Sequence, residues 1–298
     1  MNSLPVALAL AILFGPGSSS FQDPPRKQEP DVTDIDIDDL LKVQVTSPSR
    51  KEEKVTDVPA AVTVIRQDDL RRMGATTIAE ALRCVPGLQV ARTDANSWAI
   101  SARGFNSTSA NKLLVLIDGR SVYSPLQSGV FWDVHDLFLE DVDRIEVVRG
   151  PGGSLWGANA INGVINIITK RADETQGGVA VAGGGTEERF FAGARHGFKI
   201  SEDAHARVYA KYFDRDDAVD GVDDGEDAHD DWSMARAGFR ADWKLGGGDQ
   251  LRVSGDYYDG KVQERSTTFD LANPVPQAFF ERADVRGGNV VEIGRAHV

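Results

Sequence analysis

Three segments in the second half of the chain alternate with a period of two between apolar and polar residues. In residues 233–245, Ala, Phe and Trp occupy every second position, with Arg, Asp and Lys among the residues between them. Residues 204–213 and 250–259 repeat the pattern. Successive side chains of a β-strand point to opposite faces, so each segment predicts a strand with one apolar and one charged face. Strands of this kind, about ten residues long, are typical of transmembrane β-barrels.

A soluble β-sandwich would also alternate, but small and aromatic residues opposite so many charges favour a barrel in lipid. We expect about five strands, because residues 178–181 and 189–199 continue the series. Tyr212 and Trp243 near strand ends fit an aromatic girdle. The turns at 201–204 and 246–249 are short and the loop at 214–231 is long, which predicts that the short turns face the periplasm.

Residues 143–170 place two short β-branched runs, 145–148 and 163–169, on either side of a glycine-rich turn. Both runs predict buried strands. The turn lacks the lysine of a P-loop, and Leu155 stands where the third glycine of G-x-G-x-x-G would fall. We also expect a strand and no helix after the turn, so phosphate binding is not favoured.

The same stretch strongly resembles the closing motif of the plug domain of TonB-dependent outer-membrane receptors. The resemblance rests on Arg144-Ile145-Glu146-Val147, Arg149-Gly150-Pro151, Leu155-Trp156-Gly157, Asn159-Ala160 and residues 163–169. Segments 58–88, 100–105 and 113–123 match the family in the expected order, and the resemblance extends over residues 36–260. It implies an α+β plug domain followed by the first strands of an antiparallel transmembrane β-barrel, which in a complete family member has about 22 strands.

The local composition and this resemblance together divide the chain into successive parts. We predict a signal peptide at 1–20, a flexible acidic tether at 21–39, the TonB-box region at 40–48, the plug at 49–172 and incomplete barrel strands at 173–291. An open sheet edge cannot sit in lipid, so we expect an N-terminal fragment of a longer protein. Residues 292–298 resemble a translated sequencing adapter and are expected to lie outside the fold.

Local signals within the plug predict two short helices. One spans residues 68–73 and ends at Gly74, and the other begins at the capping box of residues 77–80 and runs to about Cys84. Cys84 is the single cysteine and is expected to be a small buried residue. Strands are expected at 59–65, 88–91, 98–103 and 113–117, with a hairpin turn at Asp118-Gly119.

The resemblance also indicates where partners would bind. The TonB box, which the periplasmic protein TonB would pull, falls on Val43, Gln44, Val45 and Thr46. An exposed β-prone string can add a strand to a partner's sheet edge, although an ordinary edge strand of the plug is the alternative. The apical plug loops would face the ligand or be plain solvated turns, and their residues are Arg92, Asn96, Trp98, Tyr123, Leu126 and Gln127.

Charged residues stand within apolar strands of the plug motif. Arg103, Glu146 and Arg149 either pair with one another or with the barrel wall, or they point outward on polar faces. The motif is completed by Gly150, Gly157, Asn159 and Gly163.

The long acidic loop supplies much of the net charge of −13. Ca²⁺ could bind at Asp214, Asp216, Asp223, Asp224 and Asp227, but the order differs from an EF-hand, so a solvated loop is favoured and no other cofactor is expected. The acidic balance also argues against nucleic acid as a partner.

No nucleophile with a base, fixed carboxylate pair or metal cluster is visible, so we do not expect an enzyme. The resemblance implies a receptor in the outer membrane of a Gram-negative-type bacterium, with its plug reached from the periplasm. It would bind a scarce solute, such as an iron chelate, a corrinoid or haem, and import it with energy from TonB. The alternatives are a passive plugged channel, a mainly signalling receptor and a soluble periplasmic binding module.

Overall fold

The computed structural model describes residues 44–46, 53–54, 58, 60–218, 228–270 and 273–295. It divides the chain into two compact units, residues 1–59 and 60–298. In the first unit, β1 (Gln44–Val45) pairs antiparallel with β2 (Glu53–Lys54) in a two-stranded sheet. The predicted signal peptide and tether lie outside the described residues, and so do Val43, Asp223, Asp224 and Asp227.

The second unit begins with the plug region, residues 60–172, which is built on a five-stranded mixed sheet of order β3-β8-β9-β6-β7. Its strands are β3 (Ala61–Arg66), β6 (Leu113–Ile117), β7 (Arg120–Ser121), β8 (Val142–Arg149) and β9 (Gly163–Thr169). A separate hairpin pairs β4 (Leu88–Arg92) with β5 (Trp98–Ala102). Every residue of β6 is buried, as its unbroken run of Leu, Val and Ile requires of a strand covered on both faces.

Two helices cover this sheet, as the sequence predicted. Helix α3 (Gln67–Met73) ends at Gly74, whose φ of 64° is the left-handed conformation of a helix C-cap. Helix α4 (Ile78–Leu82) begins where the Thr77 side chain accepts a hydrogen bond from the Glu80 backbone N–H. Helix α4 stops earlier than expected, so Cys84 lies beyond its buried face and is exposed. The predicted burial of Cys84 was therefore wrong.

The glycine-rich turn between β8 and β9 adopts the tight geometry that its composition predicts. Gly150 and Gly157 have positive φ values of 147° and 79°, which a residue with a Cβ rarely adopts. A one-turn helix, α5 (Gly153–Trp156), follows Gly152. Helix α5 lies within the turn and was not predicted, because four residues are too few to show a helical period; strand β9 follows the turn, as expected.

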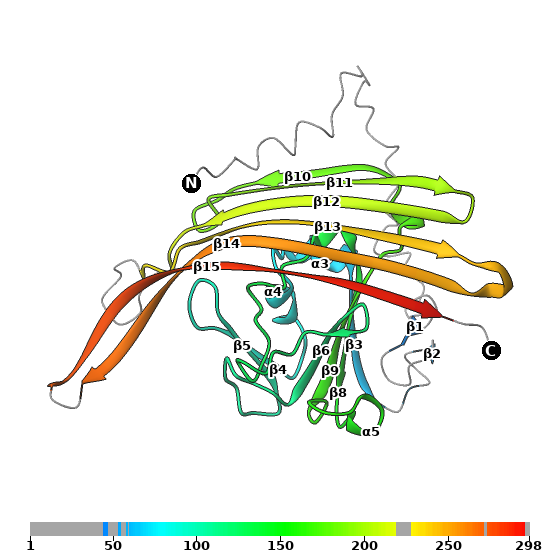
Figure 1. Cartoon of the computed structure of the whole chain (residues 1–298). Helices are drawn as coiled ribbons and strands as arrows, with labels where there is room; N and C mark the ends of the chain where they lie inside the picture. The colour runs from blue at the N-terminus through cyan, green and yellow to red at the C-terminus, as the bar shows by residue number, and fades with distance from the viewer. Residues whose placement is uncertain are drawn as a thin grey trace, which may run out of the picture. The chain divides into compact units, whose positions relative to one another are not determined.

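The remainder of the second unit is the wall sheet, six long strands that each pair antiparallel with the next (Figure 1). They are β10 (Gly177–Gly183), β11 (Phe190–Ser201), β12 (Ala204–Arg215), β13 (Trp232–Lys244), β14 (Gln250–Asp270) and β15 (Asn273–Arg295). The five predicted strands are present. The sixth, β15, was missed because prolines interrupt the pattern near its start, and residues 292–295, which we had set aside, pair within it.

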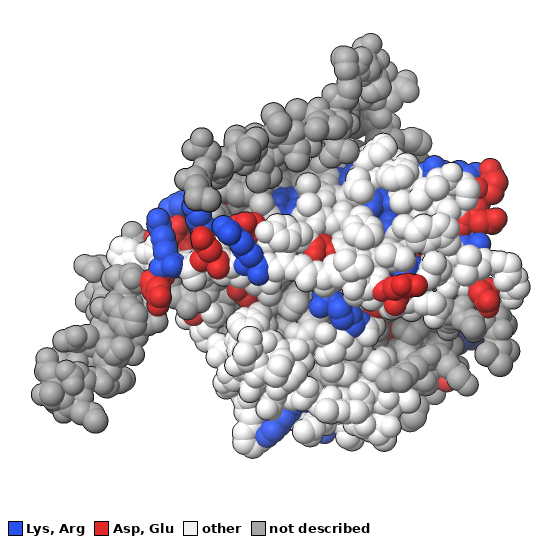
Figure 2. All heavy atoms as spheres, viewed as in Figure 1, with Lys and Arg blue, Asp and Glu red and all other residues white. Residues whose placement is uncertain are grey.

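The two faces of the wall sheet differ as the alternation predicts. The outer face exposes large apolar side chains, namely Phe198, Ile200, Tyr212, Phe239, Tyr257 and Val290. Much of the molecular face in Figure 2 is uncharged, and charged side chains gather toward the ends of the long strands. The inner face lies against the plug region, as the contacts below show. In the described part of the chain, no helix is long and apolar enough to cross a membrane.

Candidate functional site

The inner face of the wall sheet carries cationic side chains that are largely buried against the plug region. They are Arg195, Arg207, Lys211, Arg215, Arg236, Arg240 and Arg252. The strand register places Arg207 directly opposite Arg240, and Lys211 directly opposite Arg236. Like charges in directly opposed positions of a sheet repel each other, so this face needs acceptors from elsewhere.

Asp141 supplies one set of acceptors near the end of the plug region. It lies in the short turn η3 (Leu139–Asp141) and is only 4% exposed. Its carboxylate oxygens lie 3.2 Å from Arg195 Nε and 3.1 Å from Arg207 Nε. Arg207 also donates to the Lys170 carbonyl at 2.5 Å, and Arg195 donates to the Thr175 carbonyl. One buried carboxylate thus joins two wall strands to the plug.

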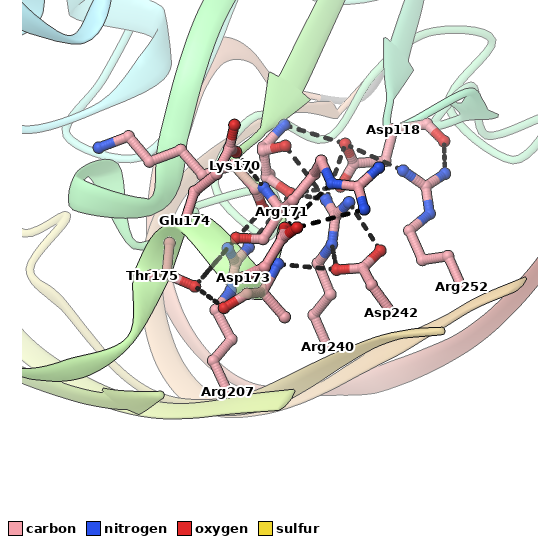
Figure 3. Close-up of polar contacts among 12 residues, drawn as sticks. Asp118, Lys170, Arg171, Asp173, Glu174, Thr175, Arg207, Arg240, Asp242 and Arg252 are labelled. Atoms are coloured by element: carbon pink, nitrogen blue, oxygen red, sulfur yellow. Dashed lines mark hydrogen bonds and ion pairs between the residues drawn. The ribbon is translucent and has the colours of Figure 1, made fainter. Parts of the chain in front are cut away.

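Asp118 supplies a second set of acceptors (Figure 3). Its Oδ1 atom lies 3.6 Å from Arg252 Nη1 and 3.8 Å from Arg240 Nη1. The same carboxylate accepts hydrogen bonds from the Thr169 backbone N–H at 2.9 Å and the Thr169 hydroxyl at 2.7 Å. Asp118 has a φ of 50°, in keeping with the predicted Asp-Gly turn, and this turn brings the carboxylate to the wall.

Arg240 and Asp242 form a two-pronged pair on β13, with N–O distances of 2.8 and 3.0 Å. Arg240 Nη1 also donates to the Thr169 hydroxyl at 2.8 Å, and Asp242 accepts the Ala172 backbone N–H at 2.7 Å (Figure 3). These bonds hold the chain where it passes from the plug region into the wall sheet. Charge-assisted bonds of this geometry are the stronger kind of hydrogen bond.

Residues 133–141 cross the middle of the inner face. Lys211 Nζ lies 2.6 Å from Asp136 and donates to the Leu137 carbonyl at 3.1 Å. Arg236 donates to the Val134 carbonyl and pairs with Asp256 at 2.7 Å. The segment therefore contributes backbone carbonyls as well as carboxylates to the wall cations.

His135 lies in the same segment, and its surroundings keep it neutral. Burial, aided by the positive charges of Arg120 and Arg236, lowers the pKa of His135 to about 3, against an opposing hydrogen bond with the Val122 backbone. A protonated imidazole here would add a further cation beside the arginines.

An apolar cluster lies beside these ion pairs, and Arg215 is placed over its Phe213 and Trp232 rings. Phe213, Trp232, Met234 and Val262 of the wall sheet pack with Ala95 and Val134 of the plug region. The larger core of the plug region is formed by its own strands and helices. The plug region is thus a separately packed body held to the wall chiefly by ion pairs and hydrogen bonds. Water can replace such contacts, so they suit a surface that separates and rejoins.

Residues 54–164 match the family model described as the TonB-dependent Receptor Plug Domain. The chain belongs to the TonB-dependent receptor family. The wall sheet is accordingly the start of the receptor's antiparallel barrel, and the inner face described above is the contact between plug and barrel. Members of this family are receptors and transporters, in agreement with the expectation that the chain is not an enzyme.

Known relatives extend the match beyond the plug. The chain is 32% identical over 249 residues to the vitamin B12 transporter BtuB of Vibrio cholerae, and the match covers 81% of this chain and 36% of that protein. It is 33% identical over 145 residues to BtuB of Vibrio vulnificus, covering 48% of the chain and 23% of the relative. The matched part of the receptor chain therefore spans about a third of the length of the first relative and less than a quarter of the second.

Solved structures share the fold. The ferripyoverdine receptor of the outer membrane of Pseudomonas aeruginosa superposes with a TM-score of 0.59 at 20% identity, covering 83% of this chain and 34% of that one. The ferric yersiniabactin uptake receptor FyuA of Yersinia pestis gives a TM-score of 0.55 at 16% identity, covering 78% and 38%. At these identities, the likeness concerns the fold of plug and barrel.

The receptor's predicted ligand-facing residues fall into two groups. Leu126 is 94% exposed, and Tyr123 and Gln127 are partly exposed beside it. Asn96 and Trp98 are only 3% and 6% exposed, so the expectation that Asn96 lies in a solvated surface loop was wrong, and little of the Trp98 side chain is open to a ligand. Trp98 begins β5 and its ring lies under the guanidinium groups of Arg83 and Arg92, while Asn96 lies within a tight turn.

Arg92 has a structural role in the same loop. Its guanidinium donates to the carbonyls of Asp94 and Ala95 and pairs with Glu187 of the loop between β10 and β11. Ala95 in turn donates its backbone N–H to Asp230, two residues before β13, at 2.5 Å. This plug loop is thus fixed to the barrel wall. A ligand-facing role for the exposed residues stays a prediction.

The charged residues of the plug motif are placed differently from one another. Glu146 is fully buried and pairs with Arg144 on its own strand at 2.8 Å. Arg149 donates to the Pro86 carbonyl at 2.5 Å, inside the plug. Arg103 is exposed and reaches toward Gly150. Asn159 has a positive φ of 69° in the turn before β9. These contacts of the motif residues all lie within the plug.

Gly163 shows why this motif needs a glycine. A Cβ on Gly163 would lie 2.4 Å from the Val148 carbonyl oxygen, closer than any unstrained contact. The close approach of β8 and β9 at this point therefore depends on the missing side chain.

The structure adds residues that the sequence analysis missed. Asp118, Asp136 and Asp141 contact the wall, together with Thr169 and Thr175. Their signal in the sequence was weak. Asp118 was expected only as a turn residue, and charged residues such as Arg207 and Arg240 were expected only to share the charged face of their strands.

The remaining predicted sites concern the acidic loop and the TonB box. Asp214 and Asp216 both pair with Arg189. Across the residues that the structure describes, no group of three or more His, Cys, Asp or Glu side chains could hold a metal ion. In the predicted TonB box, Gln44 and Val45 form β1, paired with Lys54 and Glu53 respectively.

Proposed function

We propose that this receptor binds a scarce solute at the outer membrane of a Gram-negative-type bacterium and imports it when TonB, acting from the periplasm, pulls residues 43–46. The observation that carries this proposal is the contact between plug and wall. A separately packed plug meets the barrel through Asp118, Asp136 and Asp141, which can exchange wall cations for water when pulled. The known relatives support it, since two are named vitamin B12 transporters and others are siderophore receptors.

The β-prone segment at residues 40–47 is suited to being bound and pulled by TonB. Residues 40–47 read Leu-Leu-Lys-Val-Gln-Val-Thr-Ser, and a partner's sheet edge can take up such a string as an added strand. Gln44 and Val45 already adopt strand geometry in β1. The backbone is therefore suited to strand pairing with a partner.

Uptake by cells that express the complete gene tests the proposal. The variant lacks residues 41–47, and the control lacks an equally long stretch of the tether, residues 27–33. Each strain is offered an iron chelate, a corrinoid and haem, and both surface binding and internal accumulation are measured. Loss of accumulation of one solute, with its binding retained, is expected for the first deletion alone. Equal accumulation in both deletion strains would indicate a passive plugged channel instead.

A further inference from the structure

The cations of the inner face form a continuous row along the barrel wall. The strand register places Arg252 beside Asp242, then Arg207 beside Arg240, then Arg195, then Lys211 beside Arg236, and last Arg215. Along β12 the row extends from the position of His205, opposite Asp242, to Arg215. At about 3.3 Å per residue this length is roughly 33 Å along the strand, and a strand of about ten residues with the usual tilt of about 45° spans the bilayer core.

The wall alone does not balance these charges. Arg215 is matched by Glu188 of the loop between β10 and β11. Of the other six cations, Arg240 pairs with Asp242 and Arg236 with Asp256, which leaves four without a carboxylate partner from the described wall. The plug supplies the rest of the negative charge, through Asp118, Asp136 and Asp141. Displacement of the plug therefore uncovers a wall with an excess of positive charge.

We propose that this row is an anion-binding track, covered by the plug at rest, and that the imported solute carries net negative charge on carboxylate or phosphate groups. The inference rests on the proposed function and names its substrate class. A passage lined by one sign of charge concentrates ions of the other sign, and Arg and Lys linings favour anions and phosphates.

The track has a natural docking point in Arg207 and Arg240. These residues stand directly opposite each other on neighbouring strands, so their Cβ atoms are about 5 Å apart. In the resting state both donate to Thr169 of the plug, at 3.2 and 2.8 Å. Once Thr169 leaves, the two guanidinium groups are placed to clamp one carboxylate or phosphate. The solute would thus take over bonds that the plug gives up.

A simpler account is that the cations only anchor the plug. The acid-rich sequence 214–231 beyond the outer end of the row also disfavours anions at that end. The two accounts differ in what an open barrel conducts, because anchoring alone requires no ion preference. The test therefore measures the open barrel and changes charge at the inner part of the row.

The receptor expressed from its complete gene is placed in a planar lipid bilayer, and its plug is displaced by urea. The reversal potential in a KCl gradient then gives the ratio of chloride to potassium permeability. We expect a chloride preference that falls several-fold in the double variant Arg207→Gln, Arg240→Gln. Arg286→Gln is the matched control, because Arg286 pairs with Asp259 in an outward register position of the same sheet. It should leave the ratio unchanged.

A potassium-selective or unselective open barrel would overturn the inference, as would a double variant that behaves like Arg286→Gln. Heat-modifiable migration on gels shows that each variant barrel is folded, and the wild-type ratio alone decides the sign of the preference. The measurement needs neither TonB nor an identified solute. If TonB-dependent uptake is not observed, the permeability ratio still tests the anion-binding track. If the chloride preference is not observed, the proposal of energy-coupled import is unaffected.

Discussion

Asp118→Asn removes one negative charge from the contact between plug and barrel while keeping the size of the side chain. The asparagine can still accept the Thr169 backbone N–H, and the Asp118 carbonyl can still accept from Arg252 at 2.7 Å. What is lost is the attraction of the carboxylate for Arg252 and Arg240, at 3.6 and 3.8 Å. The variant also replaces Oδ2, which accepts the Thr169 hydroxyl at 2.7 Å, with an amide nitrogen that cannot accept it.

The size of the effect follows from burial. The side chains of Asp118, Arg240 and Arg252 are 13%, 6% and 19% exposed, so water screens the pairs only partly. The gross attraction of one such pair is about 4 kcal/mol at an effective dielectric constant near 20. Desolvation and the remaining partner of Arg240, Asp242, offset much of it. We expect a net loss of about 2 kcal/mol, in the range found for hydrogen bonds to charged groups.

Urea titration of the complete receptor measures this loss, with tryptophan fluorescence reporting release of the plug. With a slope of about 2 kcal/mol per molar urea, the midpoint should fall by roughly 1 M. Asp143→Asn is the control, because Asp143 is 42% exposed and pairs with Arg144 on its own strand. An exposed pair of this kind contributes under about 1 kcal/mol. Equal midpoints for the two variants would refute the reasoning that buried plug carboxylates hold the wall.

Three further changes probe other parts of the plug. The pKa of His135 is lowered from 6.5 to about 3, so the stability that its neutral form contributes is present above pH 6.5 and lost as the pH falls toward 3. The urea midpoint should therefore drop between pH 7 and 5, and His135→Gln should flatten that dependence; an unchanged slope in the variant would contradict the assignment. Gly163→Ala forces a Cβ to 2.4 Å from the Val148 carbonyl and should destabilise the plug by about 1–3 kcal/mol, measured by protease resistance in membranes. Gly197→Ala should weaken the seating of the plug because its Cβ would overlap the Thr175 carbonyl, whereas Gly178→Ala, with its nearest atom at 3.9 Å, should behave as wild type in the same assay.

Much of the architecture could be predicted because its physical causes are local. One face of the wall sheet is exposed and apolar while the other meets charged groups, and this difference produces the period-two pattern of residues 233–245. Gly74 and the Thr77 cap mark helix ends within a few residues of each other. Strand β15 escaped prediction because its first residues include Pro274 and Pro276, which obscure a strand pattern.

The contact between plug and wall could not be predicted in the same way. Asp118 and Arg252 are 134 residues apart, and nothing local to either side chain identifies the other. The alternation did predict that Arg236 and Arg240 share the charged face of their strand, but their partners depend on the path of residues 133–141 and 169–175. Cys84 was expected to be buried and is exposed, whereas Asn96 was expected to be exposed and is buried. A shift of one or two residues at the end of a helix or strand is enough to change which side chains are buried.

Gly197 gives the passage from plug to barrel a fixed length. The Thr175 carbonyl oxygen occupies the space of the missing Cβ, 1.9 Å from where that atom would be, and Arg195 donates to the same carbonyl. Two residues later Gly177 pairs in register with Gly197 itself. An insertion or deletion within residues 172–177 would move the Thr175 carbonyl away from Gly197 and would also change the register in which β10 pairs with β11. The linker therefore has a fixed length. A plug transferred from another receptor should seat correctly only when the number of residues between its last strand and the position that contacts Gly197 is the same.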